Sequence, residues 1–82
     1  MSLPYRVILE SFPPKRREHI ERVVHKHNRA LTHHEYAALV ERVGEGTASL
    51  VGSYVEAHVA DNLVAELNYH GAKAHIESPE AT

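Results

Sequence analysis

Histidine is the chemically active residue that this sequence uses most heavily. Eight of the 82 residues are histidine, and five of the eight fall between His19 and His34. An imidazole titrates near neutral pH and binds metal ions, so the spacing of these residues decides what they can do together. Residues 34–38, HEYAA, begin like the helix motif of zinc proteases, but Ala38 stands where that motif needs its second histidine. We therefore reject a zinc-protease site.

The remaining histidines are also poorly spaced for a metal ion. No two of them lie three or four residues apart, so no single helix face presents a pair. His25, His27 and the pair at 33–34 could meet across a helix junction, but exposed or helix-capping histidines are the simpler interpretation. Glu66 and His70 have the i,i+4 spacing of an ion pair on one helix face. We expect no metal site and no cofactor.

Other catalytic arrangements are missing from the sequence as well. Cysteine is absent, which excludes disulfides, thiolate chemistry and cysteine-bound zinc. No serine stands in a nucleophile motif, and no glycine-rich phosphate loop is present. The sequence therefore predicts a protein that is not an enzyme.

Charge is divided unevenly along the chain. Residues 1–30 carry seven Lys/Arg and three Asp/Glu, a net charge of +4, whereas residues 31–82 carry two and eight, a net charge of −6. The basic first part could face an acidic partner or phosphates, although solvated helix faces are the simpler interpretation. Four tyrosines and one phenylalanine give nucleic-acid bases little to stack on. Binding of nucleic acid is therefore the weakest of these interpretations.

The elements that must position these residues follow from the hydrophobic periodicity. Two-residue alternation predicts strands, and a 3.6-residue period predicts helices. The order β-α-α-β-α-β predicts an α+β sandwich, with three helices on one face of a three-stranded antiparallel sheet. The predicted strands cover about 5–11, 47–53 and 72–77, and the predicted helices cover about 15–27, 33–43 and 55–70.

Several positions within these elements carry specific expectations. Residues 32–35 have the Thr-x-x-Glu pattern of a capping box at the start of the second helix. Leu67 belongs to the buried stripe of the third helix. In the second strand, alternation places Leu50 and Gly52 on one face and Val51 on the other.

The length and composition are those of one globular domain. A chain of 82 residues can build one core but not two, and 43% hydrophobic with 24% charged residues is an ordinary balance. No apolar run approaches 18 residues, and the first residues lack the pattern of a signal peptide. We expect a single domain over residues 1–82, with its ordered core at about 4–77, in the cytoplasm and away from membranes.

Three segments resemble one known family. Residues 5–9 (YRVIL), 18–24 (EHIERVV) and 45–54 (EGTASLVGSY) resemble the first strand, the first helix and a glycine-containing segment of ClpS, the adaptor of Clp proteases. Residues 63–76 are similar to the C-terminal domain of the bacterial ribosomal stalk protein, which shares the ClpS architecture. The resemblance covers roughly residues 5–77. It implies the same β-α-α-β-α-β fold and a role in binding other proteins.

The functional motifs of both families are altered here. The ClpS family binds the α-ammonium group of a substrate through an Asn-Asp-Asp run just after its first strand, where this chain has Ser11, Phe12 and Pro13. The methionine that the family uses beside this pocket falls near Arg17, a cation. The stalk domain uses a lysine-rich helix and a glycine-rich junction, and the junction here, residues 28–31, contains no glycine. The resemblance therefore implies partner binding with changed recognition.

We expect a non-enzymatic protein–protein interaction module, an adaptor for an AAA+ protease in which capture of N-terminal residues is altered or lost. The alternatives are a stand-alone stalk-like domain that contacts translation factors and a small nucleic-acid-binding protein. No catalytic residue and no metal ligand is predicted, the partner is another protein, and the oligomeric state stays open. The residues expected to contact the partner are Ser11, Phe12, Arg16, Arg17, Arg22 and Lys26.

Overall fold

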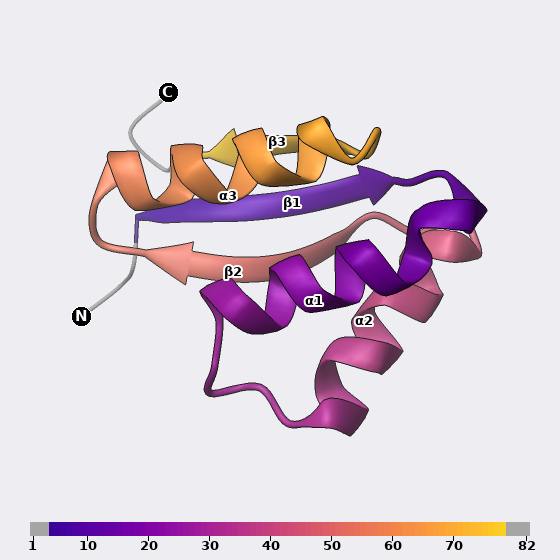
Figure 1. Cartoon of the computed structure of the whole chain (residues 1–82). Coiled ribbons are helices and arrows are strands. Elements are labelled where there is room, and N and C mark those ends of the chain that lie inside the picture. Colours follow the sequence, from indigo (N-terminus) through magenta and orange to yellow (C-terminus); the bar gives the residue numbers. More distant parts are fainter. Residues whose placement is uncertain (1–3, 79–82) are drawn as a thin grey trace.

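The computed structural model describes residues 4–78 and has the predicted order of elements. A three-stranded antiparallel sheet, in the order β2-β1-β3, carries helices α1, α2 and α3 on one face (Figure 1). The α+β fold class predicted from the sequence is therefore confirmed. The elements are β1 (Tyr5–Ser11), the 3-10 turn η1 (Pro14–Arg16), α1 (Arg17–His27), α2 (His33–Gly44), β2 (Ser49–Tyr54), α3 (Ala57–Tyr69) and β3 (Lys73–Glu77).

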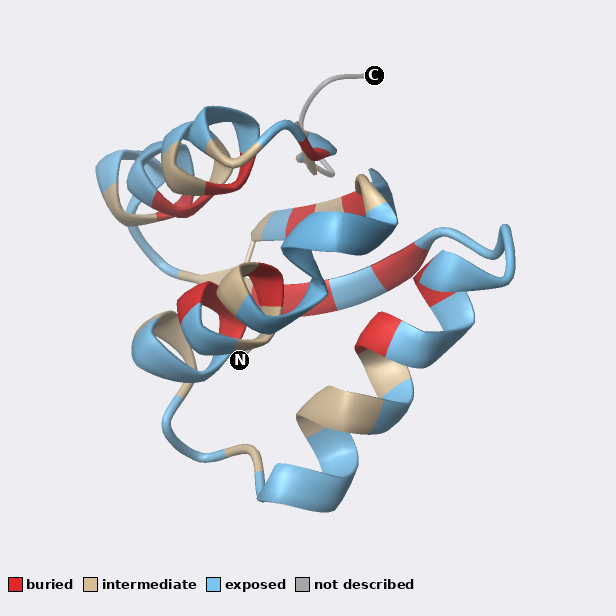
Figure 2. Cartoon of the chain, turned by 45° about the vertical axis from the view of Figure 1, so that its right-hand side comes forward, coloured by how far each residue is buried: buried red, intermediate tan, exposed pale blue. Residues whose placement is uncertain are grey.

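Alternation along the central strand β1 decides which face of the sheet the helices cover. Val7 and Leu9 are fully buried under the helices, whereas Arg6 and Glu10 point to the open face and are exposed. Figure 2 shows the buried residues, in red, along the surfaces where helices and strands meet. The hydrophobic core is thus a single layer between the sheet and the helices.

Local sequence signals mark the start of α2 and the end of α3. At the start of α2, the Glu35 N–H donates to Thr32 Oγ1 over 3.3 Å, and the Thr32 N–H donates to Glu35 Oε1 over 2.9 Å, which confirms the capping box. Helix α3 buries Leu63 and Leu67 completely, as its periodicity predicts. Gly71 follows α3 with φ +86°, a left-handed conformation that suits glycine and ends the helix.

The alternation predicted for the second strand is wrong at Gly52. The register pairs Val7 with Gly52 and Ile8 with Leu50, so Val51 is an extra residue, a β-bulge. Val51 and Gly52 are therefore both buried, and Leu50 is 44% exposed. A Cβ at Gly52 would lie 2.8 Å from Tyr54 Cε2, so the Tyr54 ring takes the space that a side chain would need.

The bounds of the other elements differ slightly from the predictions. Strand β2 begins at Ser49 and helix α3 at Ala57, two residues later than expected in each case. Ala72 precedes β3 but is 5% exposed, so it still packs in the core. Within residues 4–78 the structure contains no helix with the length and apolar character needed to cross a membrane.

Candidate functional site

Phe12, the aromatic residue expected to contact a partner, lies partly in the core. It follows β1 directly and is half-buried against the main hydrophobic cluster. Its ring lies at the end of α2, where Phe12 Cζ is 3.4 Å from the position that a Cβ on Gly44 would occupy. Phe12 therefore fills the corner between the end of β1 and the end of α2, and part of the ring remains accessible.

The other residues expected to contact a partner are exposed but not equally available. Arg17 Nε donates to Glu21 Oε2 over 3.2 Å, and Lys26 Nζ donates to Glu66 Oε1 over 3.0 Å. Both cations are thus engaged in ion pairs within the molecule. The other three residues are also exposed: Ser11 at the end of β1, Arg16 in η1 and Arg22 on α1. Neither Arg16 nor Arg22 takes part in an ion pair between described residues.

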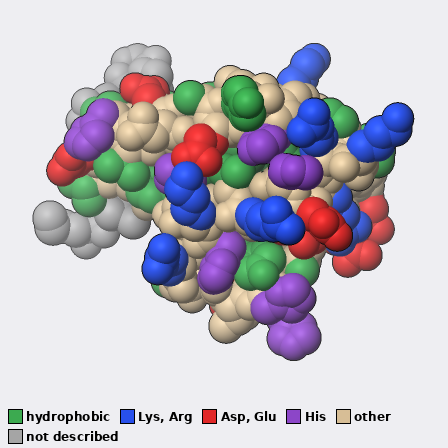
Figure 3. All heavy atoms as spheres, viewed as in Figure 1, with side chains coloured by type: hydrophobic (Ala, Val, Ile, Leu, Met, Phe, Trp, Pro, Cys, Tyr) green, Lys and Arg blue, Asp and Glu red, His purple; other side chains and the backbone are tan. Residues whose placement is uncertain are grey.

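The surface of α1 is mixed in charge rather than uniformly basic. Figure 3 shows acidic side chains and histidines interspersed with lysine and arginine on the face that carries α1. A groove of about 310 Å³ between α1 and α2 is lined on its α1 side by two carboxylates and one guanidinium, those of Glu18, Glu21 and Arg22. The net charge of residues 1–30 therefore overstates how basic this surface is.

The same groove contains a row of aromatic rings. The His25 ring stacks on Tyr36 of α2 with centroids 5.0 Å apart and an angle of 30° between the planes. The Tyr36 hydroxyl and His33 Nδ1 are hydrogen-bonded over 2.7 Å. This row of rings therefore connects the surfaces of α1 and α2.

A second, more apolar depression lies on the other side of α2. Two adjoining hollows of about 390 and 260 Å³ share Leu31 and Leu39. Leu50, exposed because of the β-bulge, lines the smaller hollow, and Arg42 lines the larger one. The predicted interaction residues do not contribute to it.

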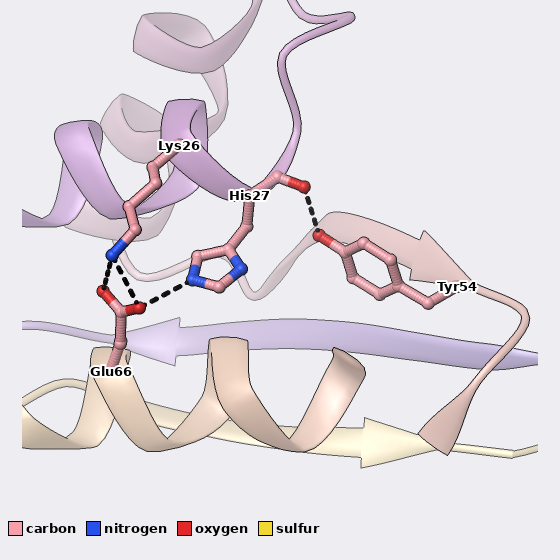
Figure 4. Close-up of polar contacts among 4 residues, drawn as sticks. All are labelled: Lys26, His27, Tyr54 and Glu66. Atoms are coloured by element: carbon pink, nitrogen blue, oxygen red, sulfur yellow. Dashed lines mark hydrogen bonds and ion pairs between the residues drawn. The ribbon is translucent and has the colours of Figure 1, made fainter. Parts of the chain in front are cut away.

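Glu66 connects α3 to the C-terminal end of α1. Its carboxylate accepts hydrogen bonds from His27 Nε2 at 2.9 Å and from Lys26 Nζ at 3.0 and 3.2 Å (Figure 4). The hydrogen bond from His27, and then that from Lys26, lowers the pKa of Glu66 below its ordinary value of 4.5. The expected i,i+4 pair with His70 is therefore replaced by contacts with the neighbouring helix. We call these three residues the Glu66 cluster.

The end of α1 is also attached to strand β2. The Tyr54 hydroxyl donates to the His27 carbonyl oxygen over 3.0 Å (Figure 4), and Asn28 Nδ2 donates to the Val51 carbonyl oxygen over 3.4 Å. Burial raises the pKa of Tyr54, so it remains a neutral donor. These two bonds join the end of α1 to β2.

The opposite end of the same interface brings two histidines together. The rings of His19, near the start of α1, and His70, just after α3, have centroids 5.1 Å apart and planes inclined by 35°. The Nδ1 atom of each is buried and has no hydrogen-bond partner. The sequence did not indicate this His19–His70 pair, because the two residues are 51 positions apart and only the packing of α1 on α3 joins them. The one local signal for this pair is that His19 directly precedes Ile20, which is buried.

No protein-family model matches the chain, and no curated protein matches it at a significant level.

Proposed function

We propose that this chain is a small protein–protein interaction module, an adaptor for an AAA+ protease that has altered or lost the capture of N-terminal residues. The position of Phe12 carries this proposal. The resemblance to the ClpS family places the acceptors of the substrate's α-ammonium group directly after the first strand. Here a phenyl ring, packed against Gly44 and the core, follows that strand instead.

Charge near Phe12 supports the same interpretation. An ammonium group is bound by carboxylate or amide oxygens. Arg16 and Arg17 lie in the turn and the helix that follow Phe12, and both are exposed. A cationic N-terminus would therefore meet guanidinium groups and an apolar ring, an environment that disfavours its binding.

The outward surface of α1 supports partner binding by another route. Arg16 and Arg22 are exposed cations outside the ion pairs of the described residues, and Arg22 borders the groove between α1 and α2. Charged residues at the rim of an interface speed association, and an arginine or aromatic residue at its centre often supplies much of the affinity. We place the partner contact on this surface, with the accessible part of Phe12 at its edge.

Binding of a purified AAA+ ATPase of the Clp class tests the adaptor role. We expect the double variant Arg16→Glu/Arg22→Glu to weaken the complex at least tenfold in biolayer interferometry, mainly through slower association. Arg42→Glu is the matched control, because it makes the same change of charge at one site on the far side of α2. This variant should bind as the wild type does.

Two results would contradict the adaptor role. The first is that the protein binds a translational GTPase and does not detectably bind the ATPase, which would favour the stalk-like alternative. The second is salt-sensitive binding of nucleic acid in place of either protein. An equal loss of ATPase binding in the Arg42→Glu control would place the contact elsewhere on the molecule.

Titration with short peptides tests the loss of N-terminal recognition. Peptides that begin with Leu, Phe, Tyr or Trp should show no saturable binding in calorimetry, because Phe12 offers no acceptor for their α-ammonium group. Amine-acetylated versions of the same peptides are the control. Micromolar binding that disappears on acetylation would show that the pocket function survives.

A further inference from the structure

The His19–His70 pair differs from the other paired histidines of the described chain. His27, His33 and His75 each have a ring nitrogen in a hydrogen bond with a side chain, over 2.9, 2.7 and 2.8 Å. His19 and His70 contact one another, yet the Nδ1 atom of each is buried without a partner. Buried polar atoms in proteins are almost always hydrogen-bonded or bound to an ion, so two such atoms in adjacent rings need an explanation.

The separation of the rings is compatible with a shared metal ion, and it is also an ordinary separation for two rings in contact. An imidazole nitrogen binds zinc at about 2.1 Å, and a tetrahedral ion holds two such rings with their centroids about 5 Å apart. The observed distance between the centroids is 5.1 Å. His19 lies on α1 and His70 directly follows α3, and both helices pack on the core beneath them, so the rings are held close before any ion arrives.

We propose that His19 and His70 together bind one divalent transition-metal ion, each through one imidazole nitrogen. Neutral imidazoles prefer Zn²⁺, Cu²⁺ or Ni²⁺, whereas Mg²⁺ and Ca²⁺ prefer oxygen ligands. Residues 4–78 contain no group of three or more His, Cys, Asp or Glu side chains arranged to hold a metal. The ion therefore keeps coordination positions for water or for a side chain of a binding partner, and it is held less tightly than a four-ligand structural zinc.

A bound ion would also connect two elements of the fold. His19 belongs to α1, and His70 immediately follows α3. In the unfolded chain the two residues are 51 positions apart, so an ion that needs both binds the native state preferentially and stabilises it. Metal binding should therefore raise the melting temperature of the wild-type protein.

Zn²⁺ titration at pH 7.4 tests the site, with calorimetry for affinity and histidine-ring NMR signals for location. We expect one ion per chain, and the first ring signals to change should be those of His19 and His70. His19→Gln and His70→Gln should each weaken binding at least about tenfold, because each removes one of two ligands. His58→Gln, at a side chain that is 71% exposed, is the matched control and should bind as the wild type does.

The same measurements can overturn the proposal. It fails if Zn²⁺ does not bind, if the signals of His33 and His34 change first, or if His58→Gln weakens binding as much as His19→Gln. Circular dichroism of each variant shows whether it is folded. If a His19 or His70 variant unfolds, two measurements on the wild type test the site instead. These are the NMR titration with Zn²⁺ and the melting temperature with and without Zn²⁺.

Discussion

The two ends of the interface between α1 and α3 are built from similar side chains in opposite ways. At one end, Glu66 accepts hydrogen bonds from Lys26 and His27. At the other end, His19 and His70 lie against one another, and neither Nδ1 atom has a partner. The contacts between α1 and the end of α3 thus include a polar cluster that is hydrogen-bonded and a histidine pair whose buried Nδ1 atoms have no partner.

The difference lies in which groups the fold places opposite a histidine. A carboxylate beside an imidazole accepts a hydrogen bond from its N–H, so the contact can stabilise the fold. Two neutral imidazoles can hydrogen-bond when an N–H of one faces the bare nitrogen of the other, but the buried Nδ1 atoms of His19 and His70 make no such bond. The Glu66 cluster is accordingly a contact between helices, whereas the His19–His70 pair is the contact for which we propose a bound metal ion.

The apolar layer under both ends should dominate the stability of the interface. Leu67 is fully buried in α3, between Glu66 and His70 in the sequence. Leu67→Ala should lower the free energy of unfolding by about 2–4 kcal/mol, through lost burial and the cavity left behind. Urea denaturation followed by circular dichroism measures this loss. If Leu67→Ala lowers the free energy of unfolding less than Glu66→Gln does, the polar contacts, and not the core, hold the two helices together.

Removing the carboxylate of the Glu66 cluster should have a smaller effect that depends on pH. Glu66→Gln should cost at most about 1 kcal/mol at pH 7, because the side chain is 36% exposed and solvent screens the charges. The pKa of Glu66 is lowered in the folded state, so its contribution is present above the unfolded pKa and is lost as the pH falls through the folded pKa.

Denaturation of the wild type and of Glu66→Gln between pH 7 and pH 3 measures this dependence. The difference in stability between the two proteins should shrink as the solution becomes acidic. Glu41→Gln, at an exposed glutamate of α2 outside the ion pairs of the described residues, is the control. A difference that stays constant over this range would show that Glu66 acts through packing rather than through its charge.

His75 offers a third environment for a histidine and the smallest expected effect. On the open face of the sheet, its Nδ1 contacts Glu10 Oε2 at 2.8 Å and its Nε2 contacts Glu77 Oε2 at 3.3 Å. The hydrogen bond with Glu10, and then that with Glu77, raises the pKa of His75 above its ordinary value of 6.5. A raised pKa contributes stability below the unfolded pKa, and this stability is lost as the pH rises through the folded pKa.

Melting temperatures between pH 5.5 and pH 8.5 check this expectation. The wild type should lose more stability than His75→Gln as the pH rises, by a small amount because the groups are exposed. Identical pH profiles for the two proteins would show that carboxylates around an exposed histidine add nothing measurable. In that case, burial alone would account for the difference between the Glu66 cluster and the His19–His70 pair.

The parts of the fold that the sequence predicted are those determined by neighbouring residues. Leu67 repeats with the helical period, and residues 32–35 form their capping box entirely among themselves. Val7 and Leu9 alternate with polar neighbours along one strand. Local periodicity and local hydrogen bonds are sufficient for such features, so the order of elements and the fold class were predictable.

The missed features depend on contacts between distant segments. The extra residue at Val51 arises from how β2 pairs with β1, and alternation within one strand cannot show it. His70 lies four residues after Glu66, just past the end of α3, but the packing of α1 brings His27 and Lys26 into contact with Glu66 instead. The contact between His19 and His70 was missed for the same reason, because His19 belongs to α1 and His70 follows α3.

The bulge in β2 has a consequence for self-association. β2 is an edge strand, and an edge strand with free backbone groups can pair with the edge of another molecule and begin aggregation. The extra residue at Val51 interrupts the regular spacing that such pairing needs, and the Val51 carbonyl oxygen already accepts a hydrogen bond from Asn28. The other edge strand, β3, carries charged Lys73 and Glu77. Both edges of the sheet thus discourage the addition of a further strand, and concentrated solutions of the folded protein should resist growth into β-fibrils.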